Sequence, residues 1–410
     1  MGKLAKYNIF FYGLMGLPLG FLGLPLYIYI PKFYATNFDI SLENIGLCVI
    51  FSRVLDTIQD PFIGWFFQKY ADKRMLAIWI CIPFLTLFWI ALLNPQSYGT
   101  IYWFLISLMG VYFFYTVLII NYLTLAADLN IFHSGTITSL NGSREAFGLL
   151  GILCAAALPS ILRNYYPDRE VFQWIGYIFG GLILVSSLCL KRIQIPMHPG
   201  TRSFKFDWSF GLKNKPFRLL LVAFIFNTAA MGFSSSLVLF YIQDVLQEAN
   251  HEGYFLAVYF LAGAAGTPLW VKLAQKFGKA RAWRASILLS IVAFIVGYFL
   301  KSHDIIPFYL ICLSTGFCLG ADLALPPSLL VETIKDKGKS TFYFSLWQMI
   351  SKLGIAVSSG FALLWLYGIG YRSGHMVHTI VEISFLYTFV PCMLKLLSFY
   401  TIGIFSKELT

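Results

Sequence analysis

Residues 50–65 read IFSRVLDTIQDPFIGW and place three charged side chains inside one of the most apolar parts of the chain. In a helix, Arg53, Asp56 and Asp60 share one face. The flanking residues predict a membrane span over residues 42–68. An ionisable group at the bilayer centre costs about 2.5 kcal/mol or more. We therefore expect this face to line a protein interior, where carboxylate oxygens suit a small cation.

The composition predicts a membrane protein. Of the 410 residues, 58% are hydrophobic and 12% are charged, whereas soluble domains carry about 25% charged residues. Aromatic residues make up 18% of the chain, as expected for lipid-facing surfaces and interfacial belts. The seven cysteines are scattered singly in apolar runs, so we interpret them as packing residues rather than as a metal site or disulfides.

Apolar runs of about 20 residues, the length needed to cross a bilayer, recur along the whole sequence. They predict twelve spans, at residues 7–34, 42–68, 75–94, 100–127, 136–162, 171–190, 217–243, 251–275, 281–300, 304–333, 341–369 and 379–405. Proline and glycine within several spans predict bent helices, which membrane bundles tolerate. The predicted fold class is all-α.

The basic residues fall mainly on one side of these spans. Of the 30 Lys and Arg, 21 lie in connections on one side, five on the other and four within spans. The positive-inside rule then predicts that both termini are cytoplasmic, in a multi-pass protein of the cell (inner) membrane. This asymmetry also accounts for the net charge of +11 without a nucleic-acid partner.

The chain contains an internal repeat. Residues 61–74 (PFIGWFFQKYADKR) align with residues 268–281 (PLWVKLAQKFGKAR) at a constant offset of 207. Both copies end the second span of their half. The positions that correspond to the three charged residues of the opening stretch hold Phe260, Gly263 and Thr267. Because the charges belong to the N-terminal half alone, they favour a function over a scaffold role.

The repeat divides the chain into two bundles. We expect an N-terminal six-helix bundle at residues 1–190, a cytoplasmic linker loop at 191–216 and a C-terminal six-helix bundle at 217–410. Two similar halves joined in this way are typical of major facilitator transporters. The expected fold is therefore twelve transmembrane helices in two pseudo-symmetric bundles.

Several motifs resemble the glycoside–pentoside–hexuronide:cation symporters, the family of the melibiose permease. The motif RxxDxxxDPxxG at residues 53–64 is similar to the second-helix motif of that family. Weaker resemblances are the Tyr115-Thr116 pair, Arg144, Lys352 and the segment at residues 320–332.

The resemblance implies a site for sodium, lithium or a proton, with no other cofactor. The residues at this cation site would be Asp56, Asp60, Thr116 and Lys352. The expected substrate ligands are Arg144, Tyr115, Asn121, Asp322, Trp347 and Gln348. Arg53 is expected to be a structural charge partner. Salt bridges that only fix the bundle are the alternative interpretation of the helix-two carboxylates, and charge balance is that of Lys352.

The sequence also departs from the family's sugar carriers. They use an acidic residue on helix one and another on helix four, but the first span here has none and Ile119 lies near the expected helix-four acid. Asp322 is a candidate replacement. We predict a cation-coupled symporter of a small organic solute, sugar or glycoside-like, that works by alternating access as a monomer in the lipid bilayer.

Other functions remain as alternatives. A related carrier of lysolipids or other lipids would need a lateral apolar opening rather than hydroxyl ligands. A membrane enzyme would need a catalytic constellation, and the sequence contains no Walker loop, HExxH, GxSxG or nucleotide fingerprint. We therefore do not expect an enzyme. A sensor that keeps the fold would usually carry an added cytoplasmic domain.

Overall fold

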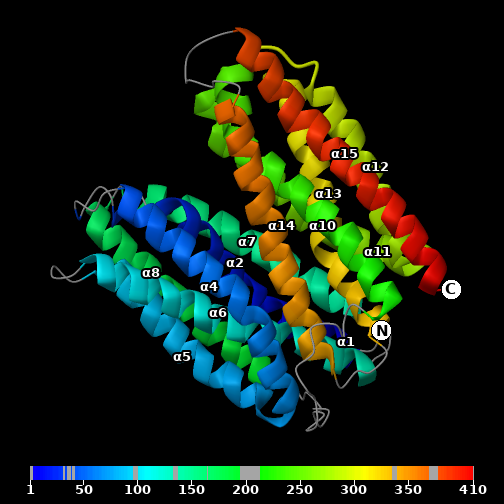
Figure 1. Cartoon of the computed structure of the whole chain (residues 1–410). Helices are drawn as coiled ribbons and strands as arrows, with labels where there is room; N and C mark the ends of the chain where they lie inside the picture. The colour runs from blue at the N-terminus through cyan, green and yellow to red at the C-terminus, as the bar shows by residue number, and fades with distance from the viewer. Residues whose placement is uncertain are drawn as a thin grey trace. The chain divides into compact units, whose positions relative to one another are not determined.

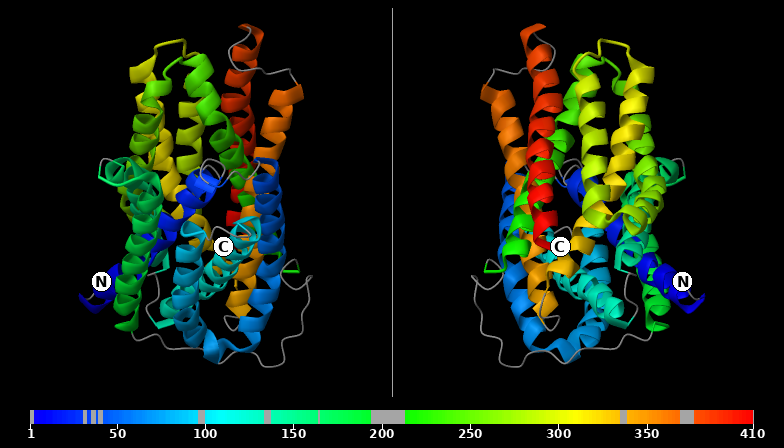
Figure 2. Two further views of the ribbon diagram at one scale, coloured as in Figure 1. Left: turned by 90° about the vertical axis from the view of Figure 1, so that its left-hand side faces the viewer. Right: turned by 90° about the vertical axis from the view of Figure 1, so that its right-hand side faces the viewer.

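The computed structural model describes residues 3–30, 33–34, 38, 42–95, 100–132, 137–163, 165–193, 213–334, 339–368 and 377–409. All regular structure in these residues is helical. The helices of each half run side by side along most of their length (Figures 1 and 2). The all-α prediction is therefore confirmed.

The helices begin and end close to the predicted spans. In the N-terminal half they are α1 (Lys3–Leu14), α2 (Gly16–Leu24) with a π-helical turn (Pro25–Tyr29), α4 (Leu42–Lys69), α5 (Arg74–Leu93), α6 (Thr100–Phe132), α7 (Ile137–Leu162) and α8 (Asp168–Lys191). In the C-terminal half they are α10 (Lys215–Phe240) with a π-helical turn (Tyr241–Val245), α11 (Glu252–Phe277), α12 (Lys279–Gly297), α13 (Ile305–Thr333), α14 (Ser340–Gly368) and α15 (Val377–Leu409). Counted together, the helical segments at residues 3–29 correspond to the predicted span at 7–34, and the other described helices correspond to the remaining eleven predicted spans.

Most of these helices suit a bilayer. Among the described residues, nine helices are long and apolar enough to cross a membrane, and Tyr7–Gly23 forms a shorter apolar helix. Neither α4 nor α7 is among the nine. These two helices carry the charged side chains considered below as a candidate site, Asp56 and Asp60 on α4 and Arg144 on α7.

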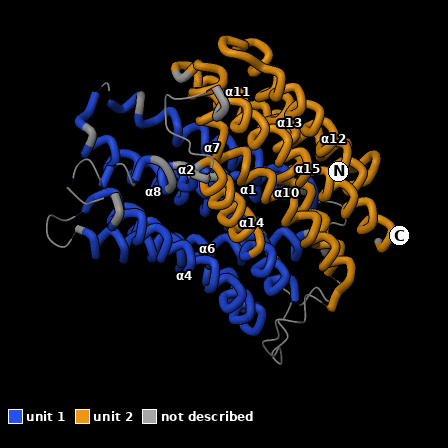
Figure 3. The backbone as a smooth tube through the Cα atoms, turned by 45° about the horizontal axis from the view of Figure 1, so that its top comes forward, with its two compact units in different colours: residues 1–206, 336–349 blue, residues 207–335, 350–410 orange. Residues whose placement is uncertain are grey.

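The chain forms two compact units (Figure 3). Unit 1 comprises residues 1–206 and 336–349, and unit 2 comprises residues 207–335 and 350–410. The first turns of α14 thus belong to unit 1 and the rest of this helix to unit 2. Within the predicted linker loop at 191–216, residues 194–212 lie outside the described residues, and the predicted bundle boundaries stay a prediction.

Small residues bring helices close together in each unit. In unit 1, a Cβ on Gly20 of α2 would lie 2.0 Å from the carbonyl oxygen of Gly148 on α7. In unit 2, a Cβ on Gly316 of α13 would lie 2.2 Å from the carbonyl oxygen of Tyr259 on α11. Only glycine allows such backbone contact, which is common between membrane helices. These crossings position Arg144 on α7 and Asp322 on α13.

A basic residue that begins the third helix of each half pairs with an acidic residue near the end of the fourth. In unit 1, Arg74 donates to Asp128 at 2.5 Å, and the side chains are 2% and 1% exposed. In unit 2, Lys279 pairs with Glu332, and the side chains are 16% and 41% exposed. The two halves therefore carry similar ion pairs at corresponding helix ends, although the sequence repeat aligns Arg74 with Arg281 rather than with Lys279. The pair in unit 1 is buried, and the pair in unit 2 is partly exposed to water.

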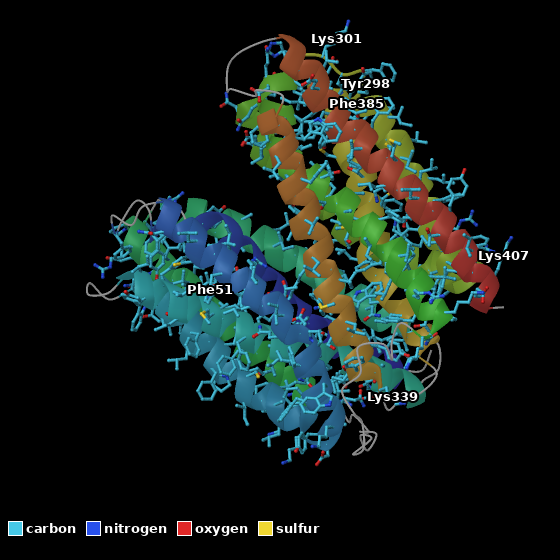
Figure 4. All side chains as sticks on the ribbon, viewed as in Figure 1. Phe51, Tyr298, Lys301, Lys339, Phe385 and Lys407 are labelled. Atoms are coloured by element: carbon cyan, nitrogen blue, oxygen red, sulfur yellow. The ribbon has the colours of Figure 1, made fainter. Side chains whose placement is uncertain are left out.

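Two lysines that the sequence predicts on opposite sides of the membrane lie at the two ends of unit 2. Lys301, counted on the predicted outer side, and Lys407, counted on the predicted cytoplasmic side, lie at opposite ends of the unit (Figure 4). This arrangement agrees with α15 and its neighbours crossing a membrane lengthwise.

Candidate functional site

The two carboxylates of the opening stretch lie on the buried face of α4. Asp56 is 3% exposed and Asp60 is fully buried. The opposite face of α4 presents apolar side chains to the surroundings at positions 47, 50, 51, 54, 58, 62 and 66, and Figure 4 labels one of them, Phe51. Helix α4 thus has one exposed apolar face and one buried face that holds both carboxylates, as expected from the cost of a charge in lipid.

Asp56 is joined to the neighbouring helix α6. The Thr116 hydroxyl, which is fully buried, donates to Oδ1 of Asp56 at 2.7 Å. The side-chain amide of Gln59 donates to the same oxygen at 3.1 Å. The structure thus brings together two of the predicted cation ligands. A hydroxyl that donates to a carboxylate keeps its lone pairs, so Thr116 can still offer oxygen to a cation.

Gln59 was missed by the sequence reasoning. It lies three residues after Asp56 on the same helix, a spacing that places the two side chains next to each other. This spacing is the feature of the sequence from which Gln59 could have been predicted as a neighbour of Asp56. The amide fixes the orientation of the carboxylate in the same way as Thr116 does from the other helix.

Arg53 stacks on an aromatic ring. Its guanidinium carbon lies 4.5 Å from the centre of the Tyr112 ring on α6, a cation–π contact. This contact holds a positive charge one turn before Asp56, and the role of Arg53 as a structural charge partner stays a prediction.

A cavity of about 1050 Å³ opens beside Asp56 in unit 1. Its polar lining residues are Ser52, Asp56, Gln59 and Lys73. The remaining lining is almost entirely apolar and comes from α4, α5 and α6, with Phe62, Ile80, Ile106 and Phe113 among the exposed side chains at its wall. The cavity is therefore an apolar groove, open at the surface of the unit, with a carboxylate in its lining.

Arg144 lies in a dense polar cluster where α7 meets α1. It donates through Nε to Glu145 at 3.0 Å and through a second nitrogen to Asn141 at 3.2 Å. Tyr12 and Tyr122 stack and donate to each other's backbone carbonyl oxygens. The neighbouring residue Glu145 is thus the counter-ion of Arg144.

The other predicted substrate ligands of unit 1 lie on α6 and α14. Tyr115 is half-buried. Asn121 is fully buried and donates to the Val117 carbonyl at 2.8 Å, while its Oδ1 has no hydrogen-bond partner among the described residues. On α14, Trp347 is buried and Gln348 is half-buried. An unpartnered buried amide oxygen calls for a donor, which suits Asn121 as a ligand.

Unit 2 holds the last two predicted residues. Lys352 is half-buried on α14, and its part in the cation site stays a prediction. Asp322 accepts a hydrogen bond from the Lys395 ammonium at 2.8 Å and one from the Trp283 indole at 2.8 Å. Sequence reasoning did not single out Lys395, although a lysine inside a predicted span was a signal of a buried partner.

No group of three or more His, Cys, Asp and Glu in the described part of the chain could hold a metal ion. The predicted site differs from such a group because it combines two carboxylates with neutral oxygen donors. We expect a site of this composition to bind a monovalent cation or a proton rather than a transition metal.

Comparison with known proteins places the chain among transporters. Residues 11–406 match the family model described as MFS/sugar transport protein. The chain belongs to this family. The predicted major facilitator fold and the resemblance to its cation symporters are confirmed, and the members of this superfamily are transporters.

Relatives within the MFS/sugar transport protein family are distant. The uncharacterized symporter YnaJ of Bacillus subtilis is 21% identical over 68% of this chain and 63% of its own length. The sodium-dependent lysophosphatidylcholine symporter 1 of Xenopus tropicalis is 25% identical over 60% of this chain and 44% of its own. The chain therefore spans less than two thirds of both proteins. The mouse sphingosine-1-phosphate transporter MFSD2B is 21% identical over 91% of this chain and 83% of its own.

Two solved structures have folds similar to the fold of this chain. The fucose:proton symporter FucP of E. coli aligns with a TM-score of 0.72 at 15% identity, over 98% of each chain. A bacterial homologue of the iron transporter ferroportin, in an outward-facing state, aligns with a TM-score of 0.71 at 13% identity, over 99% of this chain and 100% of its own. At such identities the likeness concerns the fold alone.

Proposed function

We propose that this protein is a secondary active transporter that couples the entry of a cation, sodium or a proton, to symport of an organic solute by alternating access. One observation carries the proposal: Asp56 and Asp60 are buried one turn apart on α4, and the Thr116 hydroxyl is bonded to Asp56. Two carboxylates in a membrane bundle repel each other unless a cation or a proton compensates their charge.

The cation and the solute assist each other in this proposal. A cation that neutralises the carboxylates stabilises the conformation that binds solute. Coupling of this kind corresponds to about 1–3 kcal/mol of differential affinity, and it acts in both directions. Symporters of the same superfamily among the relatives support this mechanism.

Uptake by proteoliposomes under imposed sodium or proton gradients tests the cation site. We expect Asp56→Asn and Asp60→Asn to abolish gradient-driven uptake while the protein still folds and inserts. Asp72→Asn is the matched control, because Asp72 is an exposed carboxylate shortly after the end of α4. Undiminished coupling in both α4 variants refutes the proposal.

For the solute we propose a single-chain amphiphile, such as a lysolipid. The apolar groove between α4, α5 and α6 supports this choice, because its volume of about 1050 Å³ exceeds the upper end of ordinary ligand pockets and its wall suits an alkyl chain. The relatives named for lysophosphatidylcholine and sphingosine-1-phosphate support it as well. The lack of acidic sugar ligands in the first and fourth spans points the same way.

A sugar or glycoside-like solute is the second candidate. The description of the matching family, MFS/sugar transport protein, favours it, as do the polar candidates Arg144 and Asn121. Competition between a fluorescent lysophosphatidylcholine and a panel of sugars for uptake separates the two solutes. Displacement of the probe by sugars alone contradicts the amphiphile.

Filling the groove gives a structural test of the amphiphile. Ala77 of α5 lines the groove, so Ala77→Trp is expected to reduce lysolipid uptake and leave sodium binding in place. Leu87→Trp is the matched control, because Leu87 is 60% exposed on the same helix and is not among the lining residues. Equal uptake by the two variants counts against an alkyl chain in the groove.

The proposed location is the cell (inner) membrane, with both termini in the cytoplasm. The concentration of basic residues in connections on one side supports this orientation. Labelling of single cysteines introduced at Lys301 and Lys407 by an impermeant reagent in intact cells tests it. We expect labelling at position 301 only.

A further inference from the structure

A buried ion pair in unit 2 lies outside the proposed cation site. Lys395 of α15 and Asp322 of α13 are joined at 2.8 Å, and their side chains are 5% and 4% exposed. Ionisable groups inside membrane helices are costly and mark functional sites. The side chains that contact the pair therefore bear on its role.

Each member of the pair has a second, neutral partner from a further helix. The Trp283 indole of α12 donates to Oδ1 of Asp322 at 2.8 Å, which leaves Oδ2 to Lys395. The Lys395 ammonium also donates to Oδ1 of Asn227 on α10 at 3.2 Å. If the contact between the two charges opens, neither side chain is left without a hydrogen bond.

Packing alone does not require these charges. Buried ion pairs can often be replaced by apolar side chains without loss of stability. Unit 2 already has an extended apolar core, to which α10, α12, α13 and α15 contribute Leu237, Phe294, Ile311 and Leu386 among others. A scaffold role would be served equally well by apolar residues at positions 322 and 395.

We propose that Asp322 and Lys395 form a proton-binding site in unit 2, separate from the carboxylates of α4. A proton from the aqueous phase binds Oδ2 of Asp322, and the hydrogen bond from Lys395 to that oxygen breaks. Lys395 keeps its own proton and stays bonded to Asn227, while Oδ1 of Asp322 keeps the hydrogen bond from Trp283. Release of the proton re-forms the ion pair.

The proton changes the net charge of the cluster from zero to plus one. Other titratable side chains interact electrostatically with the pair, namely Tyr259 on α11, Cys318 on α13 and Cys392 on α15. All three are uncharged in their ordinary protonated forms, so they do not compensate the added charge. Proton binding is therefore favoured when a negatively charged group of the solute, such as the phosphate of a lysolipid, lies near the pair, which links this site to the proposed symport.

Infrared difference spectroscopy of the full-length protein tests proton binding without any solute. Acidification of the wild type is expected to produce a carboxylic-acid band to which Asp322 contributes. The double variant Asp322→Asn with Lys395→Gln removes both charges together, so it keeps the cluster neutral and avoids an unpaired buried lysine. It is expected to lack that contribution, whereas Asp56→Asn with Asp60→Asn is expected to retain it. A band unchanged in the Asp322 double variant overturns the proposal.

Transport supplies the second measurement and rests on the proposed function. With fluorescent lysophosphatidylcholine as the probe, an acidic exterior is expected to raise the initial uptake rate of wild-type proteoliposomes by about fivefold or more. The ratio of the uptake rates at acidic and neutral exterior pH is expected to fall to one in the double variant. A wild-type ratio in the double variant overturns the proton site alone. If no gradient drives uptake by the wild type, the proposed function fails, and the infrared band still decides the proton site.

Discussion

Thr116 on α6 donates its hydroxyl proton to Asp56 on α4 across 2.7 Å, although the two residues are 60 positions apart in the sequence. This hydrogen bond fixes one carboxylate of the proposed cation site to a second helix. A cation that binds Asp56 therefore affects the hydrogen bond to α6 as well as the side chain on α4.

Loss of the Thr116 hydroxyl should weaken cation binding. A hydrogen bond to a charged group contributes about 1.5–3 kcal/mol, so we expect Thr116→Val to raise the sodium or proton concentration for half-maximal uptake by about tenfold or more. Thr116→Ser keeps the hydroxyl and serves as the control. The measurement is cation activation of uptake in proteoliposomes, and equal activation curves for the two variants would remove Thr116 from the site.

The two similar ion pairs should differ in their contribution to stability. Breaking the buried pair by Asp128→Asn leaves Arg74 without its counter-ion and should cost about 3–5 kcal/mol. Glu332→Gln breaks the exposed pair and should change the free energy of unfolding by about 1 kcal/mol or less. Denaturant unfolding in detergent, compared between the two variants, measures the difference. Similar losses for both would contradict the contrast in burial.

A carboxylate on the predicted outer side should make stability depend on acid pH. Hydrogen bonding lowers the pKa of Glu248, chiefly by His303 and further by His251, against the raising effect of desolvation. A lowered pKa in the folded state contributes stability that is present above the unfolded value of about 4.5 and is lost as the pH falls through the folded pKa. We expect the melting temperature of the wild type to decline below about pH 4.5 more steeply than that of Glu248→Gln. Parallel curves would show that Glu248 makes no such contribution.

The close crossing of α2 and α7 should not tolerate an added methyl group. A Cβ on Gly20 would lie 2.0 Å from a backbone oxygen of α7, and overpacking of this kind costs about 1–3 kcal/mol. Gly20→Ala should therefore lower the melting temperature. Gly181→Ala is the control, because a Cβ at that position meets nothing within 4 Å. If both variants melt as the wild type does, α2 can shift away from α7 without penalty.

The sequence predicts the helices far better than the contacts between them. Runs of apolar residues long enough to cross a bilayer seldom form anything except membrane helices, so the positions of the twelve helices were predicted to within a few residues. The buried face of α4 followed from the cost of its charges in lipid. The neighbouring residue Thr116 was predicted only through a family motif, because no periodicity within α4 identifies a residue on α6.

The ion pair of Asp322 could not be predicted from the sequence. Its partner Lys395 lies 73 positions away, and a single lysine in an apolar span does not indicate which helix it faces. A lateral apolar opening was predicted only as a feature of the lipid-carrier alternative. The sequence did not locate the groove, because its lining comes from three helices, α4, α5 and α6. Both features depend on how the helices pack against each other. Many different apolar sequences are compatible with the same packing, so the apolar residues alone do not predict it.

The different burial of the two similar ion pairs has a consequence for the response to salt. The Lys279–Glu332 pair is open to water, so dissolved ions screen it, and its strength falls as ionic strength rises. The Arg74–Asp128 pair is enclosed by protein and is largely insulated from the electrolyte. The two halves of the molecule therefore carry similar ion pairs, and only the pair in unit 2 is expected to weaken as the salt concentration of the medium rises.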